Sequence, residues 1–189
     1  MLYIIIVAIS IVIISAINAA FLPAFSLSSA AMILLSVCIG AAAAFAIDGI
    51  SALVIRRLTP ERWYIPEVKL FKVSKSERNF YNKLKIKAWK DRVPELGGFT
   101  SFHKDSLKSQ SDKEYLRRFI IEANYGVIIH IFNAILGFLV MFIPLCRMPG
   151  IWIPVFAVNF ILSILPVFIL RHTSYTLQRL YFRSVQRAS

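Results

Sequence analysis

Four long apolar stretches dominate the pattern along the chain. They run from Leu2 to about Leu22, from about Ser29 to Ile55, from about Phe119 to Leu145, and from about Ile151 to Leu170. A helix of about 20 apolar residues is long enough to cross the hydrocarbon core of a bilayer. The pattern therefore predicts an all-α integral membrane protein with four transmembrane helices.

Short turns join these stretches in pairs. Pro23 lies between the first two, and Pro149-Gly150 lies between the last two. Proline and glycine commonly mark such turns, so we expect two transmembrane hairpins. The first stretch lacks the preceding basic residues of a secretory signal peptide, and we expect it to be retained as a membrane helix.

A basic segment separates the two hairpins. Between Glu77 and Lys90, the residues Tyr81, Leu84 and Ala88 recur at helical spacing, and the lysines lie on another side of the helix. This predicts a basic amphipathic helix at the level of the lipid headgroups, and a second one is predicted from Leu177 to Val185. The predicted domains are a first hairpin (1–56), a basic interfacial segment (57–118), a second hairpin (119–171) and a basic amphipathic tail (172–189).

The charge balance indicates which partners the chain meets. It carries 22 Lys and Arg against 10 Asp and Glu, while 58% of its residues are hydrophobic. Such a composition excludes a disordered chain and disfavours an ordinary soluble domain. Because the basic residues lie between apolar spans, we expect an anionic phospholipid surface as partner and no nucleic acid. By the positive-inside rule, the basic segment and both termini are predicted to be cytoplasmic, in a multi-pass protein of the cell membrane.

The third span carries a polar stripe. With Glu122 at 0° on a helical wheel, His130 falls near 80° and Asn133 near 20°. Ionisable groups in a span usually face a protein interior or a wet cavity and mark functional sites. We expect their partners among polar residues of the other spans: Asn18, Asp48 and Asn159.

Other polar residues allow more than one interpretation. Asp48 either faces the same cavity as the stripe or pairs with a basic residue near the interface. His103 is interpreted as a solvated loop residue, and His172 as an interfacial anchor. Cys38 and Cys146 lie in or beside apolar runs, so neither a disulfide nor a metal site is expected, and no bound cofactor.

A series of short motifs follows the second span. It comprises Thr59-Pro60-Glu61-Arg62-Trp63-Tyr64, Phe80-Tyr81, Ile86-Lys87-Ala88-Trp89-Lys90-Asp91, and Ile121-Glu122 with His130. Over roughly residues 53–180, this series resembles the glycosyl-4,4'-diaponeurosporenoate acyltransferase family of small bacterial membrane proteins. The run from Ile86 to Asp91 is the most specific part of the resemblance.

The resemblance implies transfer of a fatty acyl group, with acyl-CoA as co-substrate, to a hydroxyl of a glycosylated lipid such as a glycosyl carotenoid. We expect His130 to act as general base on that hydroxyl. Glu122 is expected to orient a partner or to stabilise the imidazolium. The expected substrate-binding residues are Trp89, Lys90, Asp91, Arg92, Asn133, Arg171 and Asp48.

A second hypothesis is a non-catalytic membrane adaptor that binds a lipid or a partner subunit. It is favoured by departures from the family pattern at Ala123, Tyr125 and Val127. Substitution of His130 separates the two hypotheses, because an adaptor should tolerate glutamine there and a general base should not. A CDP-alcohol phosphotransferase is rejected, since Asp48-Gly49 lacks the further aspartates of that motif.

Overall fold

The structure, a computed structural model, describes residues 2–22, 26–93 and 113–188. These segments are helical and contain no strand, which confirms the predicted all-α class. The α-helices are α1 (Leu2–Ala20), α2 (Leu27–Leu58), α3 (Lys75–Lys83), α4 (Ile86–Trp89), α5 (Lys113–Leu136) and α6 (Pro149–Ala188). Short 3-10 helices cover Glu61–Trp63, Lys69–Phe71, Lys90–Arg92, Gly137–Phe142 and Pro144–Cys146.

Four of these helices are long and apolar enough to cross a membrane, namely α1, α2, α6 and α5 with the 3-10 turns that continue it to Phe142. The four predicted spans are therefore present as helices. The predicted tail, 172–189, is not a separate helix, because α6 continues past Leu170 to Ala188. Its 40 residues extend about 60 Å at 1.5 Å per residue, about twice the hydrocarbon thickness of a bilayer. Residues 171–188 contain no proline or glycine that would end the helix.

The single amphipathic helix expected from Glu77 to Lys90 is broken in two. Ser74 caps the start of α3, its hydroxyl accepting a hydrogen bond from the Glu77 amide at 3.0 Å. After α3, Lys85 adopts a left-handed conformation with φ 52°, which costs about 1–2 kcal/mol. The reversal brings Ile86 into the core, where it is 1% exposed. Burying such a side chain contributes about 1.5–3 kcal/mol and offsets that cost.

The chain forms two compact units. Unit 1 comprises Met1–Leu53 and Ile131–Ile164, and unit 2 comprises Val54–His130 and Leu165–Ser189. The division falls within α2, α5 and α6.

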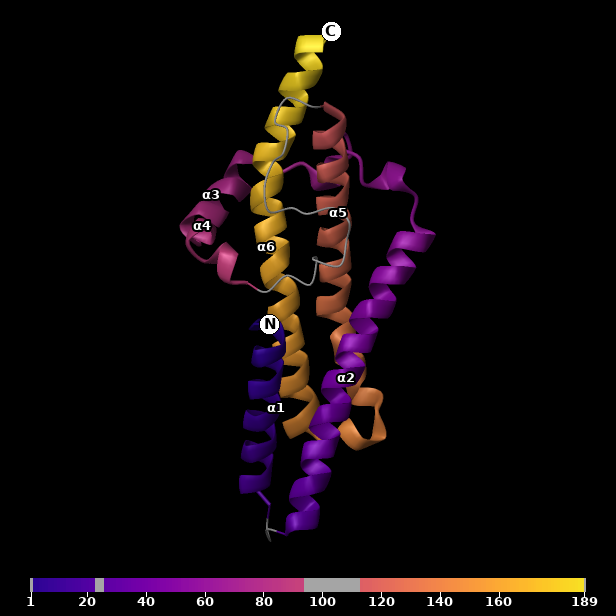
Figure 1. The fold of residues 1–189 in the computed structure, drawn as a ribbon, viewed down its shortest axis with the longest axis vertical. Coiled ribbons are helices and arrows are strands. Elements are labelled where there is room, and N and C mark those ends of the chain that lie inside the picture. Colours follow the sequence, from indigo (N-terminus) through magenta and orange to yellow (C-terminus); the bar gives the residue numbers. More distant parts are fainter. Residues whose placement is uncertain (1, 23–25, 94–112, 189) are drawn as a thin grey trace. The chain divides into compact units, whose positions relative to one another are not determined.

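The core of unit 1 is made by α1, α2, the start of α6 and the 3-10 turns between α5 and α6. Figure 1 shows α1 beside α2 and α6. Its buried residues are Ile14, Ile33, Val37, Ala44, Val140, Cys146, Ile151 and Val155. This cluster is apolar, and unit 1 also buries polar side chains outside it, among them Ser51, Asn133 and Asn159.

Unit 2 packs α3, α4 and α5 against the C-terminal part of α6 (Figure 1). One buried cluster joins α5 to α6 through Leu116, Phe119, Ile120, Leu177 and Tyr181. A second cluster joins α3 and α4 to α6 through Tyr81, Ile86 and Ile169. The segment before α3 is fixed by Gln178, whose amide donates to the carbonyl of Phe71 at 2.7 Å and accepts from the Val73 amide at 3.2 Å. The polar side chains of unit 2 are thereby held on a packed scaffold.

Candidate functional site

Glu122 is held at the surface of α5 by the end of α2. Nη2 of Arg56 donates to Oε2 of Glu122 at 2.8 Å. The same guanidinium lies 5.4 Å from the ring centroid of Tyr125, one turn further along α5. This ion pair is only partly exposed, so the Glu122 side chain has a fixed partner. Among the partners expected from the sequence, Asn18, Asp48 and Asn159, none is the one found here.

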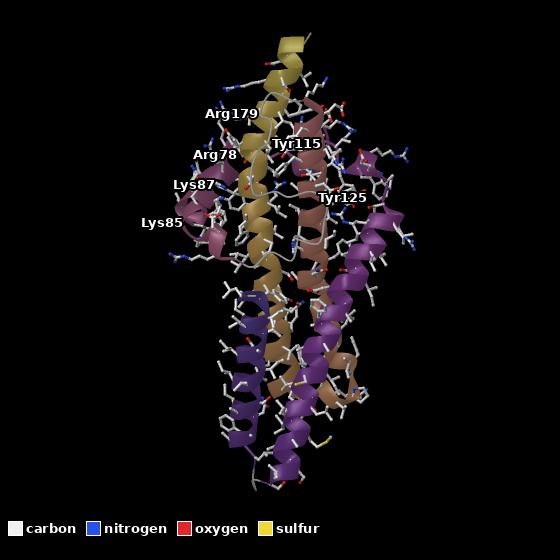
Figure 2. All side chains as sticks on the ribbon, in the orientation of Figure 1. Arg78, Lys85, Lys87, Tyr115, Tyr125 and Arg179 are labelled. Carbon is white, nitrogen blue, oxygen red and sulfur yellow. The ribbon has the colours of Figure 1, made fainter. Side chains whose placement is uncertain are left out.

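An aromatic pair fixes this geometry. The rings of Tyr64 and Tyr125 stack with centroids 3.7 Å apart. The Tyr125 hydroxyl donates to the carbonyl of Thr59 at 3.1 Å, and the Asn124 amide donates to the carbonyl of Tyr64 at 2.8 Å. The turn after α2 is thus attached to α5 at several points. Figure 2 shows Tyr125 and Tyr115 along α5.

A polar hollow adjoins Glu122 at the surface of unit 2. Its lining comprises Glu61, Glu114, Tyr115, Arg117, Arg118, Ile121 and Glu122. Arg117 is 3.4 Å from Glu61. The lining contains three carboxylates and two guanidiniums, so its net charge is close to zero. Carboxylates, guanidiniums and a tyrosine together offer many hydrogen-bond donors and acceptors. Such a surface suits an uncharged ligand with several hydroxyls better than a polyanion.

His130 lies deeper on the same helix. It is half-buried and belongs to unit 2, eight residues beyond Glu122, or about 12 Å at 1.5 Å per residue. Among the residues that line the hollow, Glu122 is present and His130 is not. The two residues of the predicted stripe therefore stand at different depths of one helix.

Asn133 belongs to a polar group in unit 1. Its side-chain oxygen accepts a hydrogen bond from Ser51, and its carbonyl accepts one from the Asn159 amide at 3.2 Å. Asp48 interacts with the same Asn159 side chain. Oδ1 of Asp48 is buried and has no hydrogen-bond partner among the described residues. Two of the predicted site residues, Asn133 and Asp48, are thus brought together through Asn159.

Arg171 makes the most complete ion pair of the described residues. Its Nε and Nη2 donate to the two carboxylate oxygens of Glu77, each at 2.8 Å, and its Nη1 donates to the carbonyl of Phe71 at 3.1 Å. The Tyr81 hydroxyl also donates to Glu77 at 2.8 Å. Burial raises the pKa of Glu77, but the hydrogen bonds from Arg171 and Tyr81 outweigh it and leave the pKa below its usual value. Burial and the carboxylate beside it raise the pKa of Tyr81 to about 12, so the phenol keeps its proton. Arg171 therefore positions the α3 segment against α6.

The residues of the most specific motif lie on α4 and the turn after it. The indole N–H of Trp89 donates to the carbonyl of Leu84 at 2.9 Å, and its ring packs on the Tyr81–Ile86 cluster. Lys90 and Asp91 are 3.1 Å apart at the surface. Arg92 is exposed on the same turn. These four residues are accessible to a ligand at the surface of unit 2.

Three residues that sequence reasoning missed hold the predicted ones. They are Arg56 for Glu122, Glu77 for Arg171 and Ser51 for Asn133. Of these three, only Arg56 could have been found from the sequence. It is the first charged residue after the second apolar stretch, and Glu122 lies near the start of the third. If these two spans pack antiparallel, Arg56 and Glu122 lie at a similar level. His103 lies outside the described residues. Within those residues, no cluster of three metal-ligating side chains occurs.

Comparison with known proteins adds one finding. The family model described as glycosyl-4,4'-diaponeurosporenoate acyltransferase matches residues 60–183, more than half of the chain. No match was found among curated proteins or among solved structures. The matched region includes the hollow, Glu122, His130, the Trp89–Arg92 turn and Arg171. The chain therefore belongs to the glycosyl-4,4'-diaponeurosporenoate acyltransferase family.

Proposed function

We propose that this protein transfers a fatty acyl group from a coenzyme A thioester to a sugar hydroxyl of a glycosylated membrane lipid, such as a glycosyl carotenoid. Family membership over residues 60–183 supports an acyltransferase of this kind. The four long apolar helices support a membrane location, where such an acceptor resides. We place the protein in a bacterial cell membrane with both termini and unit 2 at the cytoplasmic face, in line with the basic segment.

The polar hollow beside Glu122 is the proposed site for the sugar of the acceptor. This observation carries the proposal, because the lining combines carboxylates, guanidiniums and Tyr115 without a large net charge. Sugar hydroxyls both donate and accept hydrogen bonds, so Glu122 and Arg117 can bind neighbouring hydroxyls. Arg56 holds the Glu122 side chain in place.

The chemical step is assigned to His130. In this proposal the acceptor extends along α5 from the hollow to His130, about 12 Å beyond Glu122 at 1.5 Å per residue. The His130 ring then accepts the proton of the acceptor hydroxyl while the hydroxyl oxygen attacks the thioester carbonyl carbon. The carbon–sulfur bond then breaks, and the imidazolium returns the proton to the departing thiolate. The products are the sugar ester and free coenzyme A. A cation such as Lys90 or Arg92 stabilises the negative charge on the carbonyl oxygen.

The remaining predicted residues take supporting roles. Trp89 and Asp91 shape the surface beside Lys90 and Arg92, and Arg171 holds that segment through Glu77. Asn133 and Asp48 supply a polar group within the apolar helices of unit 1. In this proposal that group contacts a substrate within unit 1.

The test uses the full-length protein in nanodiscs, with radiolabelled palmitoyl-CoA as donor and a glucosylated carotenoid as acceptor. Wild type is expected to form a labelled glycolipid. His130→Gln is expected to lower kcat by about 10²–10⁴-fold, the usual contribution of a general base. His103→Gln is the matched control, since the same substitution in the predicted loop should leave kcat unchanged. Transfer that persists in His130→Gln would overturn the assignment of the base.

A membrane adaptor remains the second candidate function. The observation that favours it is the lining of the hollow, which among the described residues reaches Glu122 without His130. An adaptor would form no labelled product with any acceptor, and its His130→Gln variant would behave as wild type. Comparative lipidomics of a host with and without the gene decides between the two, because only the enzyme adds an acylated glycolipid.

A further inference from the structure

Two arginines from different helices meet at one aromatic ring in unit 2. The guanidinium carbon of Arg78, on α3, lies 4.4 Å from the ring centroid of Tyr175, on α6. That of Arg179, one turn further along α6, lies 5.8 Å from the same centroid. A guanidinium over an aromatic face is oriented as well as attracted. The Tyr175 ring therefore holds both guanidiniums near it, although arginine side chains are long.

Further cations gather on the same surface. The positive charges of Lys87, Arg78 and Lys90 all act on the ring of His172, which lies one turn before Tyr175. The Asn82 side chain is 3.4 Å from that histidine, which joins α3 to α6 here. Figure 2 shows the labelled Arg78, Lys85 and Lys87 on the α3–α4 segment, and Arg179 on the neighbouring helix.

The acids nearest in sequence do not neutralise this surface. Glu77 is bound by Arg171 through both of its oxygens, and Asp91 pairs with Lys90. Within the described part of the chain, no carboxylate forms an ion pair with Arg78, Lys87 or Arg179. Like charges brought together repel one another, and a bound anion removes that repulsion.

We propose that Arg78, Arg179 and Lys87 form a binding site for a phosphate group. A guanidinium fork matches two phosphate oxygens, and one fork from α3 and one from α6 lie 4.4 Å and 5.8 Å from the same ring centroid. Lys87 adds a third positive charge. The phosphate belongs either to a soluble phosphorylated molecule such as coenzyme A or to the headgroup of an anionic lipid.

This site is separate from the polar hollow in chemistry, since it is cationic where the hollow is balanced. It does not depend on acyl transfer, because binding is measured without an acceptor. Loss of transfer in the activity assay would leave this proposal standing. Loss of phosphate binding would leave the assignment of His130 standing.

The experiment measures binding to the full-length protein in two arms. In the first arm, coenzyme A is titrated by calorimetry into protein in nanodiscs of neutral phosphatidylcholine. In the second, detergent-purified protein is mixed with vesicles of phosphatidylcholine with or without phosphatidylglycerol. Variants Arg78→Gln and Arg179→Gln remove one fork each, and Arg62→Gln is the matched control on an exposed arginine outside the cluster.

Each cluster variant is expected to weaken binding about 10-fold or more, as for the loss of one charge-assisted contact, while Arg62→Gln changes it less than twofold. A selective effect in the first arm identifies a soluble phosphate, and one in the second arm identifies a lipid headgroup; either supports the site. Arg78→Lys keeps the charge and guards against misfolding, and it is expected to bind between wild type and Arg78→Gln. If the cluster variants match Arg62→Gln in both arms, the proposal is overturned.

Discussion

Replacing Gly137 with alanine tests how tightly the polar group of unit 1 is packed. Gly137 is buried at the start of the 3-10 helix that follows α5. A Cβ atom added there would lie 2.5 Å from Nδ2 of Asn159. Because unbonded carbon and nitrogen atoms do not approach so closely, the Asn159 amide must move. Its hydrogen bond to the carbonyl of Asn133, now 3.2 Å long, is then lost.

The expected cost follows from three contributions. Overpacking a well-packed core costs about 1–3 kcal/mol, and a hydrogen bond between membrane helices contributes about 0.6 kcal/mol. Alanine gains about 0.5–1 kcal/mol over glycine in a regular helix. Since this gain roughly offsets the lost hydrogen bond, Gly137→Ala is expected to lower the free energy of unfolding by about 1–3 kcal/mol.

The free energy of unfolding is measured in detergent micelles by titration with a denaturing detergent, with helical content followed by circular dichroism. Gly49→Ala is the matched control, because the structure as described has no heavy atom within 4 Å of a Cβ added there. That variant is expected to gain about 0.5–1 kcal/mol. A further variant, Asn159→Ala, removes the amide that the new methyl group would strike. In its background, the cost of Gly137→Ala should disappear.

Two results would refute this reasoning. One is a Gly137→Ala variant as stable as Gly49→Ala, which would mean that the site has room for a methyl group. The other is a cost that persists undiminished in the Asn159→Ala background. The strain would then arise elsewhere, and the Asn133–Asn159 contact would not be a feature of the packed unit.

Two further predictions concern charge and orientation. Burial raises the pKa of Glu77, but the hydrogen bonds from Arg171 and Tyr81 lower it by more, so the pKa lies below its usual value. The ionised Glu77 therefore contributes to the free energy of unfolding above about pH 4.3. This contribution is lost as the pH falls through the lowered pKa. Glu77→Gln is therefore expected to lower the melting temperature of the protein at pH 7 and to change it little at pH 2; equal effects at both pH values would contradict the ion pair. In a cysteine-free variant, an impermeant maleimide added outside the cell is expected to label a cysteine at Ser26 and not one at Arg62. The reverse pattern would contradict the proposed orientation.

The four spans were predictable from the sequence because each is a run of about 20 apolar residues with few interruptions. The break at Lys85 was not, because a left-handed lysine leaves no signature in the hydrophobic pattern. It exists because Ile86 gains more by burial against Tyr81 and Ile169 than the backbone loses. The continuity of α6 beyond Leu170 was missed for a related reason. The sequence changes from apolar to polar at residue 171, which indicates that the chain leaves the apolar part of the membrane. Such a change in composition does not end a helix, and α6 continues through it.

The candidate site was predictable only one residue at a time. Helical spacing places Glu122 and His130 on one side of α5, and burial cost marks both as unusual in an apolar span. Their partners depend on how distant segments pack, which periodicity does not encode. Arg56 therefore takes the place that Asn18, Asp48 or Asn159 was expected to fill, while Asn159 instead binds Asn133 within unit 1.

Unit 2 has two kinds of charged surface, one basic and one nearly balanced, because its acids are paired with particular partners. The acids with a described side-chain partner there are Glu61, Glu67, Glu77, Asp91 and Glu122. Because these acids are already bound elsewhere, the surplus of basic residues is left on α3, α4 and the end of α6, whereas the hollow beside α5 stays near balance. A neutral sugar gains hydrogen bonds in a balanced site, and a phosphate gains affinity only where positive charge is in excess. A reaction between a neutral glycolipid and a phosphorylated acyl donor needs both kinds of surface, whereas an adaptor that binds lipid alone has no need of the balanced one.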